Sequence, residues 1–269
     1  MNTGARSIRS SGCLLGLLIL FVMPASAAPT AIAEVLQESA PTPSCNTEPE
    51  DLSKEQLTRY TVEGTVIAHS GSFSKSYGNP GFQLSDATGG VFVLTDRNLG
   101  FEEEDRARVT GWPCIQFGTR ALGQAEVTLL DDDGLGAFSP RQIGQFEARP
   151  AIPGSPDVVN NWCNCDTPVS STEGLLITVR GTAMADLEQD GAFGYKLYLD
   201  DGRGVGQVFI DALSGIPAEE LEEDMLRQGN DLCVTGVVAR FAGVGFELLP
   251  RSEDDFIEAR PDREDPCED

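Results

Sequence analysis

The sequence contains a single histidine, His69, among 269 residues, and this scarcity narrows the chemistry open to the protein. Serine and cysteine nucleophiles are usually activated by a histidine that a carboxylate orients. The sequence around His69 does not identify a carboxylate for this role. The sequence also lacks the G-x-S-x-G, P-loop and H-E-x-x-H motifs. We therefore expect a non-enzymatic protein without a cofactor. A hydrolase that works through two of the many carboxylates is the less favoured alternative, because no particular pair stands out.

Basic residues are scarce as well. There are 19 Lys+Arg against 43 Asp+Glu, which gives a net charge of −24. Residues 42–150 carry a net charge of −7 and residues 151–260 a net charge of −13. Proteins bind nucleic-acid backbones mainly by neutralising phosphates with Lys and Arg, and a surface this acidic repels phosphate at long range. The charge balance thus disfavours nucleic acid. It favours simple solubility or a salty medium, with binding of a cation or of a basic partner as the alternative.

Long apolar runs are missing except near the start of the chain. A basic leader at residues 6–9 precedes an apolar stretch at residues 13–23 and a small-residue sequence that ends at Ala27. This order is typical of a secretory signal peptide. We expect residues 1–27 to be removed by cleavage near Ala27, which leaves a secreted (periplasmic or extracellular) protein with no membrane segment; a lipid-anchored form is the lesser alternative.

The sequence does contain an internal repeat. Residues 62–66 read VEGTV and residues 179–183 read VRGTA, and a VTG follows in each copy, at residues 109–111 and 234–236. Self-similarity of this length indicates two copies of one folding unit, each with its own core. The expected organisation is a loose N-terminal segment at 28–50, a first domain at 51–142, a linker at 143–172, a second domain at 173–259 and an acidic tail at 260–269.

Each copy holds five short strand-like segments. They fall at residues 59–69, 82–84, 91–94, 107–117 and 121–130, and again at 175–184, 195–199, 207–210, 234–241 and 244–249. An acidic connector at 101–105 follows the third segment of the first copy. A helix is predicted at 217–227 in the second copy, where Pro and acids come first and Arg comes last. The order is that of an OB-fold barrel, so we predict an all-β protein of two tandem five-stranded OB-fold-like barrels.

Several short motifs of the two copies are shared with a known family. In the second copy they are LDDG at 199–202, QVFID at 207–211, VTGV at 234–237 and FELLPRS at 246–252, followed by Asp254 and Asp255. This copy resembles the OB-fold modules of secreted bacterial proteins, which are often found beside extracellular nuclease or lamin-tail-like domains. The first copy is similar but looser, because it lacks the LPRS ending. The resemblance implies the OB fold. It suggests nucleic-acid binding only because such modules often accompany nuclease domains.

Six cysteines remain after the leader, an even number that indicates disulfide bonds in an exported chain. They are Cys45, Cys114, Cys163, Cys165, Cys233 and Cys267. Their positions in the repeat favour a bond between Cys45 and Cys114 and a bond from Cys163 or Cys165 to Cys233, with Cys267 taking the remaining thiol. The close pair at 163 and 165 has no second pair with which to form a structural zinc site, so we expect no zinc.

OB-fold barrels bind single strands with aromatic side chains that stack on bases and with basic groups along a groove. In the first copy such residues gather near the loop at 70–80 and the neighbouring strand face, and the candidates are Phe73, Lys75, Tyr77, Arg97 and Arg120. The alternative is that the aromatic residues simply pack the loop.

A second candidate site is an acidic loop in the second copy. Asp186, Glu188 and Asp190 precede Gly191 in the manner of a calcium-binding loop, but the twelfth position is Leu197 instead of a glutamate. An acidic hairpin loop is therefore favoured over a metal site.

Together, these observations predict an exported binding protein for a protein or glycan partner, with single-stranded DNA binding as the alternative that the resemblance suggests.

Overall fold

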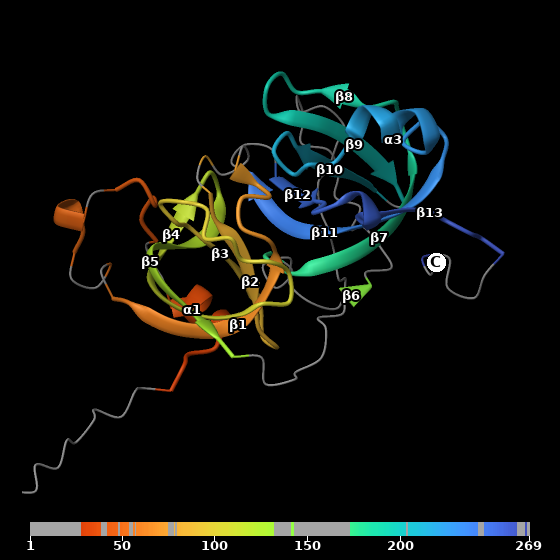
Figure 1. Cartoon of the computed structure of the whole chain (residues 1–269). Helices are drawn as coiled ribbons and strands as arrows, with labels where there is room; N and C mark the ends of the chain where they lie inside the picture. The colour runs from red at the N-terminus through yellow and green to blue at the C-terminus, as the bar shows by residue number, and fades with distance from the viewer. Residues whose placement is uncertain are drawn as a thin grey trace, which may run out of the picture.

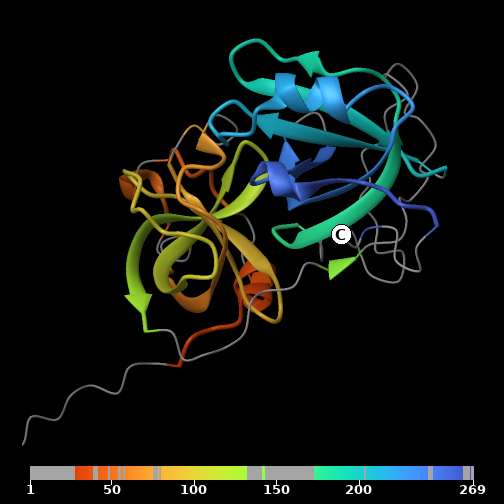
Figure 2. The ribbon, with the colours of Figure 1, turned by 45° about the vertical axis from the view of Figure 1, so that its right-hand side comes forward.

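The computed structural model describes residues 28–38, 42–47, 49–53, 56, 58–74, 78, 80–131, 141–142, 173–202, 204–241, 245–262 and 267. Two β-barrels lie side by side within this part of the chain (Figures 1 and 2). The predicted leader at 1–27 and the predicted linker at 143–172, with Cys163 and Cys165, lie outside the described residues. No described helix is long and apolar enough to cross a bilayer.

The first barrel closes through five strands in the order β1-β2-β3-β5-β4. The strands are β1 (Tyr60–Ala68), β2 (Phe82–Ser85), β3 (Gly90–Val93), β4 (Arg106–Gln116) and β5 (Thr119–Leu130). β3 and β5 run parallel, whereas the other neighbouring pairs are antiparallel. This closed arrangement confirms the predicted OB-fold-like barrel.

The second barrel repeats the same order. Its strands are β7 (Leu176–Ala183), β9 (Gly194–Asp200), β10 (Val205–Asp211), β12 (Gly245–Leu249) and β11 (Asp231–Phe241), and pairing of β11 with β7 closes the ring. β10 and β12 form the parallel pair. The helix α3 (Ala218–Asp224) stands between β10 and β11, within the predicted helical range.

Short elements extend the second sheet. β6 (Arg141–Gln142) pairs with β7, β8 (Glu188–Gln189) pairs with β9, and β13 (Phe256–Glu258) pairs with β11. The 3-10 turns η1 (Pro49–Asp51) and η3 (Glu253–Asp255) complete the described elements. β6 belongs to the second sheet, although its residues end the predicted first domain.

The repeated glycine explains how each ring closes. β1 pairs with β4 up to Thr65 and with β2 from Thr65 onward, so it changes partner beside Gly64. A Cβ atom at Gly64 would lie 2.5 Å from the backbone oxygen of Ser85 on β2. Gly181 occupies the same place on β7, where a Cβ atom would lie 3.2 Å from the oxygen of Asp200. Glycine therefore lets the first strand of each barrel bend closely around the second.

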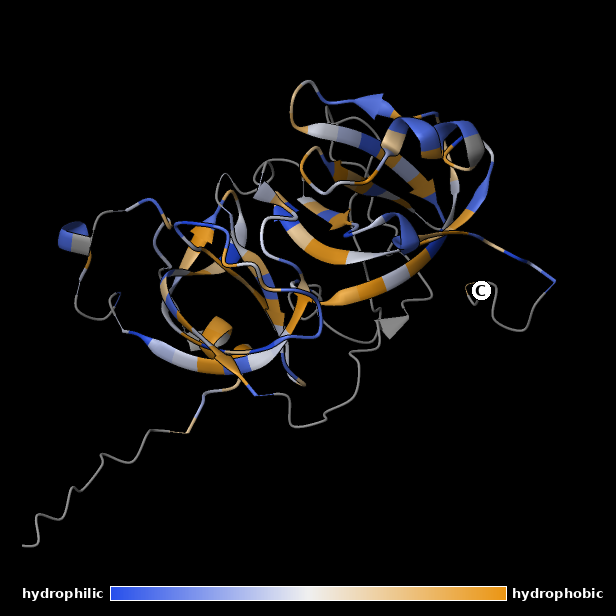
Figure 3. Cartoon of the chain, viewed as in Figure 1, coloured by the Kyte–Doolittle hydropathy of each residue, from blue (hydrophilic) through white to orange (hydrophobic). Residues whose placement is uncertain are grey.

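A helix from the N-terminal segment fills one end of the first barrel. α1 (Ile32–Glu38) buries Ile32 and Val35 against the barrel core, and the Ile32 N–H donates to Asp86 Oδ2 in the β2–β3 turn at 2.9 Å. We predicted from the sequence that this segment, residues 28–50, is a loose N-terminal segment, so the packed helix α1 is a difference from that prediction. In the second barrel α3 covers the end away from the β9–β10 turn, and Leu221 and Met225 pack against the core there. Figure 3 shows that most of the α3 ribbon carries the colour of hydrophilic residues.

The two barrels share a third apolar cluster. The first barrel contributes Ile67, Phe73, Phe92, Leu94 and Trp112 among others, and the second contributes Leu176, Phe209, Val237 and Leu249. At the edge of this cluster Arg251 donates from Nη1 to Ile67 O at 3.0 Å and to Glu103 Oε2 at 2.7 Å. The barrels therefore pack through a common core and not only through surface contacts.

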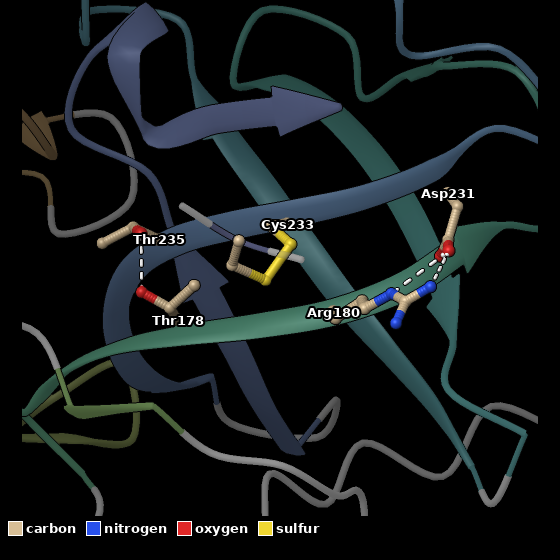
Figure 4. Close-up of a disulfide and its surroundings, with 6 residues drawn as sticks. Thr178, Arg180, Asp231, Cys233 and Thr235 are labelled. Carbon is tan, nitrogen blue, oxygen red and sulfur yellow. Dashed lines mark hydrogen bonds and ion pairs between the residues drawn. A yellow bond between two sulfur atoms is a disulfide. The ribbon is translucent and has the colours of Figure 1, made fainter. Parts of the chain in front are cut away.

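The described disulfides confirm one predicted bond and correct the other. Cys45 is bonded to Cys114, as predicted. Cys233 is bonded to Cys267, so the predicted bond from Cys163 or Cys165 to Cys233 is wrong. The reason is that β13 pairs with β11, with Ile257 opposite Cys233, and this pairing brings the C-terminal tail to β11. Figure 4 shows this disulfide between two cross-strand pairs, Thr178 with Thr235 and Arg180 with Asp231.

Candidate functional site

The outer face of the second and third strands is the usual ligand surface of an OB-fold barrel. In the first barrel, β2 and β3 are buried on both faces. Phe92 is 1% exposed and packs in the cluster shared with the second barrel. The Gln83 amide donates to Gly174 O at 2.9 Å, and a Cβ atom on Gly90 would lie 1.8 Å from the same oxygen. The second barrel thus covers the strand face that we expected to bind a ligand.

The predicted aromatic residues do not form an exposed stacking surface in the described structure. Phe73 is buried in the shared cluster, so its ring is not open to a ligand. This burial matches the alternative interpretation, in which the aromatic side chain packs the loop. Lys75 and Tyr77 lie outside the described residues.

The two arginines predicted to bind a ligand, Arg97 and Arg120, lie in different parts of the first barrel. Arg120, at the start of β5, donates its backbone N–H to Glu173 Oε1 at 2.7 Å, and its Nε lies 3.8 Å from Glu173 Oε2. Burial raises the pKa of Glu173, and the bond from Arg120 partly offsets this effect. Arg97 is exposed in the connector after β3. The structure therefore does not bring these two cations together.

Arg97 lines an open hollow of about 540 Å³ where β3 and β5 separate. Its walls come from residues 94–97, 99, 124–125 and 127. One acid, Asp96, accompanies the one arginine, and the other six lining residues are uncharged. The hollow has no net charge and therefore does not favour a phosphate-bearing ligand over a neutral one.

The corresponding face of the second barrel, on β9 and β10, is partly covered too. Phe209 packs in the shared cluster. Beside it, the Gln207 amide donates to Glu247 Oε2 at 3.2 Å across the β10–β12 pair, and both side chains are buried. Burial raises the pKa of Glu247 to about 7, although the charge of Lys196 and the bond from Gln207 act against it. This buried acid is not among the site residues predicted from the sequence.

Lys196 is the one basic residue in β2, β3, β9 and β10. Its Nζ lies 3.1 Å from Asp190 Oδ2, so an internal acid already balances its charge. Sequence-independent binding of a single strand depends on cations along the groove. Within the described strands β2, β3, β9 and β10, no lysine or arginine other than the paired Lys196 could bind a phosphate.

The calcium candidates have separate partners. Asp186 Oδ1 accepts the Gln228 backbone N–H at 3.0 Å, Asp190 pairs with Lys196, and Glu188 is exposed on β8. Within the described ranges, no three Asp, Glu, His or Cys residues are grouped so that they could hold a metal ion.

A different surface stands out at the α3 end of the second barrel. It consists of residues 184–193 and 211–224, and we call it the acidic end. These two segments contain nine acidic residues and no basic residue. Three large apolar side chains are exposed there: Met184 at 45%, Phe193 at 58% and Leu213 at 55%. None of these was predicted from the sequence, although Phe193 and Leu213 lie in Gly-containing, acidic turns where strand alternation gives no reason for a large apolar side chain.

Comparisons with known proteins leave the family open. No family model matches the chain, and no curated protein matches it. One similar solved structure is a murine DNA-binding protein bound to double-stranded DNA, with 10% identity, a TM-score of 0.31 and coverage of 71% of this chain and 95% of that one. Another is a deletion mutant of the single-stranded DNA-binding protein from Thermus aquaticus, with 13% identity, a TM-score of 0.22 and coverage of 79% and 98%. Likenesses this low carry no argument about function.

Proposed function

We propose that this chain is an exported, non-catalytic interaction protein whose two OB-fold-like barrels act as one unit and bind a protein partner. The observation that carries the proposal is the burial of the β2–β3 face of the first barrel beneath the second barrel. The face that would hold an oligonucleotide or oligosaccharide is used for packing. The surfaces left for a ligand lie elsewhere, on loops and on α3.

Charge supports a protein partner over a nucleic acid. The net charge of −24 opposes approach to phosphates, and the cation on the β9–β10 face is paired with Asp190. A basic protein surface would be attracted by the same field, which increases the rate of association.

Two disulfides support the exported state, because such bonds persist in oxidising compartments. The signal-peptide pattern at residues 1–27 points the same way.

The test is photo-crosslinking of the full chain in its native host. A photoreactive residue replaces an exposed side chain on α3, such as Glu223, and the adducts are then digested. We expect an adduct that protease removes and that nuclease and glycosidase leave intact. An adduct removed by nuclease would overturn the proposal in favour of the nucleic-acid alternative.

A further inference from the structure

The acidic end, formed by residues 184–193 and 211–224, is a single continuous surface. Ala212 donates its backbone N–H to Phe193 O at 2.9 Å, which joins the two segments. Tyr195 Oη donates to Glu219 Oε1 at 2.8 Å, which ties β9 to α3. Figures 1 and 2 both place α3 and β8 on the side of the second barrel that faces away from the first. Packing between the barrels therefore leaves this end uncovered.

Phe193 and Leu213 are the most exposed apolar side chains of the surface. They are among six large hydrophobic side chains that the described residues leave exposed. The backbone holds both in place. Gly194, with φ at 150°, packs so closely that a Cβ atom would lie 1.9 Å from Ile210 O, and the Leu213 N–H donates to the buried Asp211 at 2.8 Å. A backbone that is already fixed before binding loses little conformational entropy when a partner covers it.

Acidic side chains of α3 belong to the same surface as this apolar pair, and Glu219 is joined to β9 through Tyr195. Glu219, Glu220 and Glu223 are exposed on α3, and the nearby cation of Lys196 is already paired with Asp190. Anionic lipid headgroups would be repelled by this surface, whereas lysine and arginine side chains would be attracted.

We propose that the acidic end binds a basic, amphipathic segment of a partner protein. The apolar face of that segment covers Phe193 and Leu213, and its lysines and arginines face the glutamates of α3. This inference rests on the proposed function, because it presumes a protein partner and adds the place and the chemistry of binding. The mode matches the general pattern in which an amphipathic segment lays apolar anchors on an apolar surface within a charged rim.

The test uses a fluorescent synthetic peptide of leucine and lysine, patterned as an amphipathic helix, with the disulfide-bonded protein from residue 28 onward. A matched peptide has the same charge and serine in place of leucine. Fluorescence anisotropy should show saturable binding of the first peptide and at least tenfold weaker binding of the second.

Variants then locate the site. Phe193→Ser and Leu213→Ser should each weaken binding of the leucine–lysine peptide about tenfold, and Glu220→Lys with Glu223→Lys should weaken it further and reduce its dependence on salt. Leu129→Ser is the matched control, because Leu129 is 54% exposed on β5 of the first barrel. It should leave binding unchanged. Circular dichroism should show all of these variants folded, because each substituted side chain is exposed.

The outcomes separate this inference from the proposed function. Equal binding by the wild type, Phe193→Ser and Leu213→Ser would overturn the acidic end as the site, while protein adducts in the crosslinking experiment would still support the broader proposal. Tight binding to vesicles of anionic phospholipid that is lost in Phe193→Ser would overturn the inference in favour of a membrane surface.

Discussion

Arg251 of the second barrel and Glu103 of the first form an ion pair across the junction between the barrels, with Nη1 and Oε2 2.7 Å apart. The same guanidinium donates to the Ile67 carbonyl and, through Nη2, to Asp255 Oδ1 at 2.7 Å. One side chain of the LPRSEDD sequence thus links the end of the second barrel to β1 and to the acidic connector of the first.

Replacing this arginine should loosen the junction. Arg251→Ala removes the guanidinium from the buried Asp255 and leaves it only the backbone N–H of residue 251, and we expect a loss of about 3 kcal/mol in the free energy of unfolding. Arg180→Ala is the control, since its pair with Asp231 is largely exposed and should contribute less than about 1 kcal/mol. Urea unfolding of both variants measures the difference. Equal losses would contradict the assigned role of Arg251.

Two adjacent glycines test the close packing of β3 against the second barrel. Gly90→Ala places a methyl group against the Gly174 oxygen, so it should destabilise the protein by about 2 kcal/mol or more. Gly89→Ala places a methyl group no closer than 3.6 Å to any neighbour and should cost less than about 1 kcal/mol. Thermal melts of the two variants compare them directly, and a neutral Gly90→Ala would show that the barrels are farther apart than described.

The buried Glu247 should make stability depend on pH. Burial raises its pKa in the folded protein to about 7 from the ordinary value of 4.5, so between these pH values the folded state holds a proton that the unfolded state has released. Its contribution to stability therefore falls as pH rises from about 4.5 to about 7 and then levels off.

Glu247→Gln removes that titration. The variant should match the wild type near pH 4.5 and exceed its stability by up to about 3 kcal/mol at pH 8. Urea unfolding at both pH values checks this expectation. A constant difference between the two proteins across the range would show that Glu247 is not desolvated.

The disulfide of the C-terminal tail can be mapped directly. Proteolysis under non-reducing conditions should release a peptide pair joined through Cys233 and Cys267. Recovery of Cys233 joined to Cys163 or Cys165 would instead restore the pairing that the sequence favoured.

Much of the fold could be predicted from the sequence because alternation and glycine spacing are local signals. All ten barrel strands and α3 fall where the pattern indicates them. The disulfide pairing was harder to predict. The strand β13, which brings Cys267 to β11, has only three residues and is too short to show strand alternation. The helix α1 was missed, although Ile32, Val35 and Leu36 have the spacing of one apolar helical face.

The candidate site was harder to predict because it depends on how the barrels meet. Val91, Phe92 and Val93 form an unbroken apolar run, which is the signal of a strand buried on both faces. We interpreted it only as a short strand, and so placed the ligand on a face that the second barrel covers. The alternation of apolar and polar residues within one domain does not show which of its faces contacts the other domain.

A salt titration with single-stranded DNA tests the central claim most directly. A fluorescent oligothymidylate is mixed with the protein from residue 28 onward, with its disulfides intact, and anisotropy is followed from low to physiological salt. The covered β2–β3 face and the acidic surface predict no saturable binding even at the lowest salt. Saturable binding that weakens steeply as salt rises would contradict the account.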